Sequence, residues 1–148
     1  MADEARRDEG MSAELDELSS ELMGEALDRL ADEGSMGVML VVETADGEVE
    51  LFEFVDDGAE QMLEGARDHV KSLVRLGQAK ESALPVRYAI AYEGAVDTGE
   101  GYEDALLLEF GERGWPAFSA FSLVSGKGTG DGFAWTDPAP AGEVEPLL

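Results

Sequence analysis

The sequence contains no cysteine, one histidine and only ten lysines and arginines in 148 residues. Without cysteine, the chain can form neither disulfides nor thiolate metal sites. With His69 as its only histidine, it cannot build a two-histidine metal motif. His69 lies beside the apolar stripe of a predicted helix, and we interpret it as a residue without a chemical role.

Long apolar runs are also absent. The longest purely apolar run covers residues 38–42, far below the ~20 residues that a membrane-spanning helix needs. The first eleven residues are polar and do not resemble a secretory signal. We therefore expect no membrane partner and a cytoplasmic location.

Acidic residues dominate the charge. The 34 aspartates and glutamates give a formal net charge of −24. Such a surface repels phosphate backbones and anionic lipids, so nucleic acid and membranes are excluded as expected partners, whereas basic proteins, metal ions and polyamines are favoured. Two explanations of the acidity stay open: a solvated surface set by the proteome or a salty cytoplasm, or a face shaped for a basic partner. In either case salt should stabilise the fold.

Apolar periodicity predicts two helices. The first begins after an N-cap at Ser12 and ends at Gly34, which suits a C-terminal cap. The second begins with a possible capping box from Asp57 to Glu60, and its apolar stripe reaches residue 74. Each helix has an apolar face that another layer must cover.

Strand patterns fill most of the remaining chain. Segments 36–44 and 48–57 flank Asp46 and Gly47, which predict a hairpin with a type I′ turn. Further strands are predicted at 86–94, 102–110 and 115–124, with a short one at 133–135. Short connections require antiparallel pairing.

These elements predict an α+β fold in the order α-β-β-α-β-β-β(-β). We expect a single antiparallel sheet of five or six strands with two helices on one face. The element order is similar to that of roadblock-like domains. The domain should span residues 12–136, between a mobile acidic tail (1–11) and an extended proline-rich tail (137–148). An uncovered sheet face could pair with a second subunit to form a homodimer.

An acidic stretch at 95–104 is the predicted cation site. Calcium and similar hard cations take oxygen ligands from such loops. The candidate ligands are Asp97, Glu100, Glu103 and Asp104. An EF-hand starting at Asp97 is excluded, because Gly99, Gly101 and Leu108 stand where oxygen ligands are needed. A solvated acidic loop is the competing interpretation.

Two other motifs give weaker indications of a functional site. Glu93, Glu109 and Glu112 could supply a catalytic carboxylate pair, although neighbouring acids are expected by chance in so acidic a chain. The glycine-rich segment 125–132 lacks the spacing of a phosphate-binding loop and is interpreted as a turn.

Aromatic residues gather near the C-terminal strands. Such residues are usually part of a core, but if exposed they would form an interaction patch. The candidate partner-binding residues are Trp115, Phe118 and Trp135.

With no catalytic motif and no predicted cofactor, we expect a small non-catalytic protein-binding or regulatory module with an acidic surface. An immunity or inhibitor protein directed against a basic partner is one concrete version. The alternative is an enzyme that uses carboxylates and a bound divalent cation.

Overall fold

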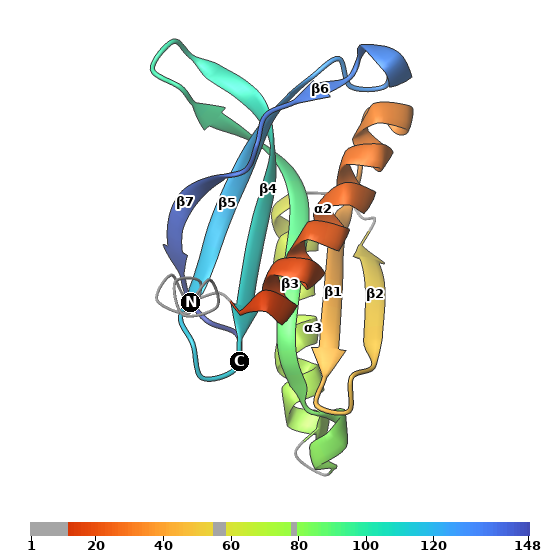
Figure 1. Cartoon of the computed structure of the whole chain (residues 1–148), viewed down its shortest axis with the longest axis vertical. Coiled ribbons are helices and arrows are strands. Elements are labelled where there is room, and N and C mark those ends of the chain that lie inside the picture. Colours follow the sequence, from red (N-terminus) through yellow and green to blue (C-terminus); the bar gives the residue numbers. More distant parts are fainter. Residues whose placement is uncertain (1–11, 55–58, 78–79) are drawn as a thin grey trace.

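Figure 1 shows the computed structural model of the chain, which describes residues 12–54, 59–77 and 80–148. The predicted tail at 1–11 and half of the predicted capping box at 57–60 lie outside these residues. The helices and strands follow the predicted order: α2 (Ala13–Glu33), β1 (Val38–Thr44), β2 (Val49–Phe54), α3 (Ala59–Gly77), β3 (Pro85–Asp97), β4 (Tyr102–Glu112), β5 (Ala117–Ser125), β6 (Ala134–Trp135) and β7 (Ala139–Val144), with short 3-10 turns η1 (Glu81–Ala83) and η2 (Gly130–Gly132).

Both predicted caps of helix α2 are confirmed. The Ser12 hydroxyl oxygen accepts the Leu15 amide at 3.0 Å, and Gly34 adopts the left-handed conformation with φ 78°. The Ser12 hydroxyl also donates to the carboxylate of Glu112 at 2.7 Å. The cap therefore joins the start of α2 to the end of β4.

The β1–β2 hairpin forms as predicted, but its turn is not type I′. The Thr44 amide donates to the Glu48 carbonyl, and the Gly47 amide donates to the Thr44 carbonyl, both at 2.9 Å. Gly47 has φ 87°, whereas no described residue other than glycine has positive φ. The connection is thus a three-residue loop that ends in a glycine bulge. The Asp46 carboxylate accepts from the Glu48 amide at 3.3 Å and from the Thr44 hydroxyl, which stabilises this loop.

The strands form one antiparallel sheet in the order β2-β1-β3-β4-β5-β6, with β7 also paired to β5. The longest pairing joins β3 and β4 over eleven residue pairs. β6 pairs with the end of β5, and β7 pairs with its start, so the two share the outer edge of β5. The α+β class, the single sheet and the order of elements are confirmed.

The C-terminal segment differs from the predicted tail. Residues 139–144 form β7, which gives the sheet a seventh strand. Pro140 is tolerated within β7 because an outer strand needs no donor on its free side. Leu147 and Leu148 then pack against an apolar cluster beneath α3. The segment therefore lies against the domain.

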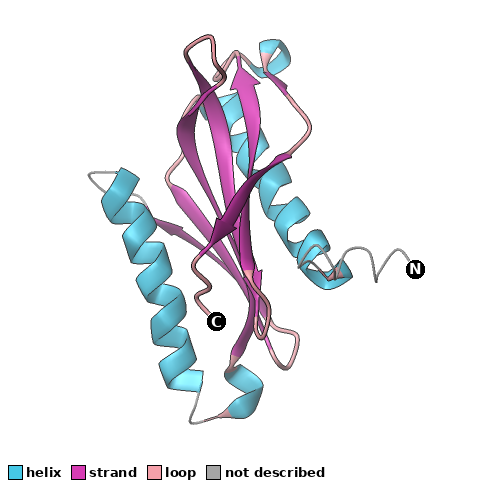
Figure 2. Cartoon of the chain, turned by 90° about the vertical axis from the view of Figure 1, so that its left-hand side faces the viewer, coloured by secondary structure: helices cyan, strands magenta, loops and turns pink. Residues whose placement is uncertain are grey.

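The two helices cover opposite faces of the sheet, which corrects their predicted placement on one face (Figure 2). Successive strand residues point to alternate faces. Met39 and Val41 of β1 pack with α2, while Val38, Leu40 and Val42 pack with α3. β1 is apolar on both sides because each side meets a helix. Within the described residues, neither helix is long and apolar enough to cross a membrane.

The glycine-rich segment 125–132 is a turn that packs against the C-terminal end of α2. Gly34 and Gly128 approach so closely that a Cβ added at Gly128 would lie 3.3 Å from the Gly34 Cα. Beside them, the Lys127 ammonium contacts Glu93 at 3.3 Å and Asp104 at 3.4 Å. Burial alone would lower the pKa of Lys127, but these two carboxylates raise it above its ordinary value.

Candidate functional site

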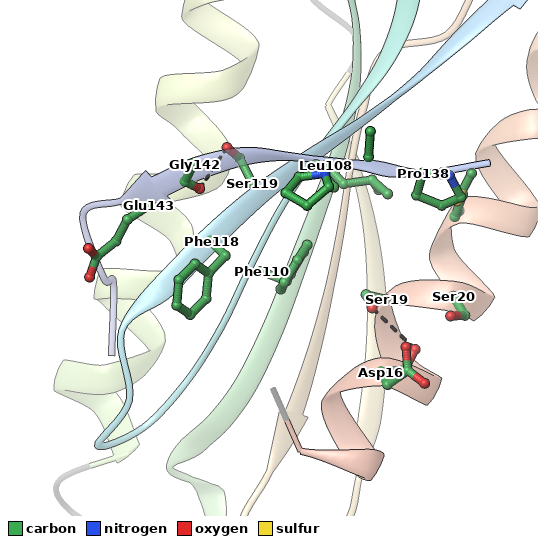
Figure 3. A pocket seen from close by; sticks show the side chains of 14 residues that line it. Asp16, Ser19, Ser20, Leu108, Phe110, Phe118, Ser119, Pro138, Gly142 and Glu143 are labelled. Atoms are coloured by element: carbon green, nitrogen blue, oxygen red, sulfur yellow. Dashed lines mark hydrogen bonds between the residues drawn. The ribbon is translucent and has the colours of Figure 1, made fainter. Parts of the chain in front are cut away.

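A groove of about 660 Å³ opens on the α2 face of the sheet, between α2 and β7. We call it the α2–β7 groove. It forms because α2 does not cover β4, β5 and β7 completely (Figure 3). Its lining residues come from these four elements and the chain before β7: Asp16, Ser19, Ser20, Met23, Leu108, Phe110, Phe118, Ser119, Ala120, Pro138, Ala139, Pro140, Gly142 and Glu143.

The floor of the groove is apolar. Phe110 and Phe118 are paired residues of β4 and β5 and therefore point to the same face. Phe110 is only 8% exposed, and Phe118 is partly buried against the same core. Figure 3 shows both rings between β7 and α2. A large apolar group entering the groove would contact aromatic and aliphatic side chains already in place.

The rim of the groove is polar and acidic. Asp16 and Ser20 lie along α2 on one side, and Glu143 lies on β7 on the other. The Ser119 hydroxyl donates to the Gly142 carbonyl at 3.1 Å, which holds β7 at the outer wall. Among the described residues that line the groove, none is basic. An apolar floor with an acidic rim suits a ligand that is both apolar and cationic.

Only one of the three predicted aromatic contact residues lies in this groove. Phe118 forms part of its floor, whereas Trp115 and Trp135 are not among its lining residues. Trp115 is partly buried at the turn before β5, and Trp135 is 50% exposed on β6. Phe110 and the α2 residues of the groove were not among the predicted contact residues. The alternation of Leu106, Leu108 and Phe110 was visible, but the position of α2 relative to them was not.

The structure does not gather the four predicted cation ligands into one group within the described residues. The described residues contain no group of three or more acidic or histidine side chains that could hold a metal ion. Much of the acidic stretch 95–104 is strand, because β3 continues to Asp97 and β4 begins at Tyr102. Glu103 and Asp104 are successive strand residues and point to opposite faces. Asp104 instead pairs with Lys127 at 3.4 Å.

The three carboxylates considered for catalysis are also separate. Each has a different cationic partner: Glu93 pairs with Lys127 at 3.3 Å, Glu109 with Arg67 at 2.6 Å and Glu112 with Arg87 at 2.6 Å. None of the three is paired with another carboxylate in the described chain, so this arrangement offers no acid–base pair.

The Arg67–Glu109 pair lies in a second hollow, of about 730 Å³, between α3 and the C-terminal segment. Glu109 is 5% exposed, and Arg67 binds its carboxylate with two donors, Nη2 at 2.6 Å and Nε at 3.3 Å. The Tyr92 hydroxyl donates to the same carboxylate at 2.8 Å. Burial and the nearby Glu109 charge raise the pKa of Tyr92. The carboxylate is fully engaged, which indicates a structural ion pair rather than a general base.

His69 packs among aromatic rings. The centroids of its ring and the Phe52 ring are 4.4 Å apart, and Phe54 lies at 6.0 Å, both edge to face. Its Nε2 is buried and has no hydrogen-bond partner in the described part of the chain. Among the residues that the structure describes, no carboxylate is hydrogen-bonded to this ring, as the orientation of a catalytic base would require.

Comparison with protein-family models, with curated proteins and with solved structures finds no match in any of the three. The similarity in element order to roadblock-like domains therefore carries no family assignment.

Proposed function

We propose that this chain is a non-catalytic, cytoplasmic protein-binding module that recognises a basic segment of another protein. A large apolar side chain of that segment would enter the α2–β7 groove, and flanking lysines or arginines would face its rim. The observation that carries the proposal is the apolar floor formed by Phe110 and Phe118 beside the acidic Glu143. The net charge of −24 supports a cationic partner.

A basic partner is favoured over a homodimer at this site. Two copies of the chain would each bring a charge of −24 to the contact, and like charges in an interface cost several kcal/mol. An immunity or inhibitor protein that neutralises a basic protein is the concrete form of the proposal.

The test adds a short lysine-rich peptide with one central leucine to the full chain and follows binding by the NMR chemical shifts of the chain. We expect shifts at Met23, Phe110 and Phe118, and we expect an alanine in place of the leucine to weaken binding about tenfold. Loss of a buried leucine costs ~1.5–3 kcal/mol, which corresponds to at least that factor.

Two protein variants locate the site. Phe118→Ser should weaken binding about tenfold. Glu143→Lys should weaken it more than Glu17→Lys, which makes the same charge change at an exposed α2 residue outside the groove. Equal losses from both lysine variants, or shifts away from the groove, would contradict the proposal. The amide spectrum of each free variant checks that it is folded.

A further inference from the structure

β2 forms the outer edge of the sheet opposite β6 and β7. Its six residues pair only with β1 among the described strands, with no shift along the ladder. Half of the backbone donors and acceptors of such a strand point away from its neighbour. They are available to another extended chain.

Of the usual protections of an edge strand, β2 has only charged side chains, those of Glu50 and Glu53. Such strands are commonly guarded by lysines, prolines or bulges, and residues 49–54 contain none of these. Val49 and Leu51 are instead 53% and 49% exposed, and both lie on the α2 face. Two exposed apolar residues on an open edge indicate a contact surface.

A second groove, of about 420 Å³, lies on the α2 face beside this edge. We call it the α2–β2 groove. Leu18, Leu22, Val41 and Leu51 form its apolar part, and Glu21, Glu25 and Asp28 of α2 stand around it. An added strand would therefore place every second side chain near an apolar groove bordered by carboxylates.

The charges at this edge select the partner. Glu48 and Glu50 are exposed on or next to β2, and Glu53 is held by Arg29 through two hydrogen bonds. A second copy paired edge to edge would bring these glutamates together, and like charges on facing strands are unfavourable. A strand with a lysine or arginine beside Glu50 would meet opposite charge instead. Glu50 lies on the α3 face of β2 with Phe52 and Phe54, whereas Glu53 lies on the α2 face.

We propose that β2 accepts an extended segment of another protein in which basic and apolar residues alternate. The apolar side chains would lie beside Val49 and Leu51, and the basic ones would lie beside Glu50. This surface shares no residue with the α2–β7 groove, so the two proposals stand or fall separately.

The probe is a capped peptide of alternating lysine and valine, as long as the six residues of β2. Hydrogen exchange and NMR would be recorded on the full chain with and without the peptide. We expect slower exchange of those β2 amides that do not face β1, together with shifts at Leu18, Leu22 and Leu51. A peptide of alternating glutamate and valine should give neither effect.

Matched variants separate strand addition from general attraction between charges. Glu50→Lys should weaken lysine–valine binding about tenfold, whereas Glu64→Lys, an exposed position on α3, should change it less than twofold. Phe118→Ser, which alters the other groove, should leave this binding intact.

The inference would be overturned by unchanged β2 exchange at about 1 mM peptide or by equal weakening from both lysine variants. Sedimentation that shows the free protein to be a dimer with a protected β2 would overturn it as well. Shifts confined to Met23, Phe110 and Phe118 would also overturn it, while supporting the groove proposal.

Discussion

The amide of Gly128 donates a hydrogen bond to the carbonyl oxygen of Leu30 at 2.9 Å. The same oxygen accepts the Gly34 amide at 3.0 Å. The last carbonyls of a helix have no partner within it. The turn at 125–132 therefore completes the C-terminal end of α2 with a donor from a distant part of the chain.

Gly126→Ala should disrupt this turn. The new Cβ would lie 2.2 Å from the Gly132 carbonyl oxygen, at a φ of 70° that alanine rarely adopts. We expect a loss of about 2–4 kcal/mol in the free energy of unfolding, measured with urea. Gly130→Ala is the matched control, because its φ is also positive and its Cβ would meet nothing within 4 Å. It should cost only about 1 kcal/mol, and equal losses would rule out the clash.

Arg67→Met should remove the cation from a buried carboxylate. Of its two partners, the Glu109 carboxylate would then keep only the Tyr92 hydroxyl as a hydrogen-bond donor. We expect a loss of about 2–3 kcal/mol in the free energy of unfolding, which is less than for a fully buried pair because Arg67 is partly exposed. Adding Glu109→Leu should restore much of this loss, as a double-mutant cycle by urea unfolding would show. Glu33→Gln at the exposed Arg29–Glu33 pair is the control, with an expected cost below about 0.5 kcal/mol. Additive effects at 67 and 109 would contradict the coupling.

Stability should fall as pH rises from 10 to 12. Burial raises the pKa of Tyr88 from 10.0 to about 12, an increase that the Leu147 backbone partly offsets. Within this range the unfolded chain loses the phenolic proton while the folded chain keeps it, so unfolding is favoured as pH increases. Tyr88→Phe should flatten this slope in urea unfolding measured at several pH values. An unchanged slope would show that Tyr88 does not cause it.

Two glycine substitutions should change the stability of the fold in opposite directions. Gly24 lies within α2, and a Cβ there would meet nothing within 4 Å, so Gly24→Ala should stabilise the fold by about 0.5–1 kcal/mol. A Cβ at Gly111 would lie 2.7 Å from the Tyr88 ring, which is 1% exposed and cannot move freely. Gly111→Ala should therefore cost about 1–3 kcal/mol. Thermal unfolding measures both, and a neutral Gly111→Ala would contradict the packing at Tyr88.

Added salt should raise the melting temperature. A charge of −24 repels itself, and screening of exposed carboxylates relieves that repulsion. Calorimetry in NaCl and in CaCl₂ at matched ionic strength should give similar gains if screening is the cause. A larger gain in calcium that disappears in Asp97→Asn would instead support the cation site predicted from the sequence.

Local rules predicted the elements well. Ser12 and Gly34 act through neighbouring residues, so their cap roles could be predicted without knowledge of the fold. The placement of the helices depended on the alternation within β1: Met39 and Val41 form one apolar face and Leu40 contributes to another, so each face needed its own cover. Three prolines suggested a tail after residue 136, yet the outer strand β7 accommodates one of them, Pro140.

The candidate site could be predicted only in part. Phe118 was found because aromatic residues cluster near the C-terminal strands. Its neighbours Asp16 and Met23 come from α2, and no local pattern states where a helix crosses a sheet. The Arg67–Glu109 pair could not be predicted for the same reason, because it joins a helix and a strand that only the tertiary fold brings together.

The double-sided burial of β1 has a consequence for how the chain finds its native pairing. In most strands, a slip by one residue would turn polar side chains inward, and this cost prevents the slip. In β1 a slip would exchange Met39 and Val41 for Leu40 and Val42, so both faces would still be apolar. Hydrophobicity alone cannot choose between these alignments. The choice falls to side-chain volume and to the loop at Gly47, whose length determines which residues of β1 face α2.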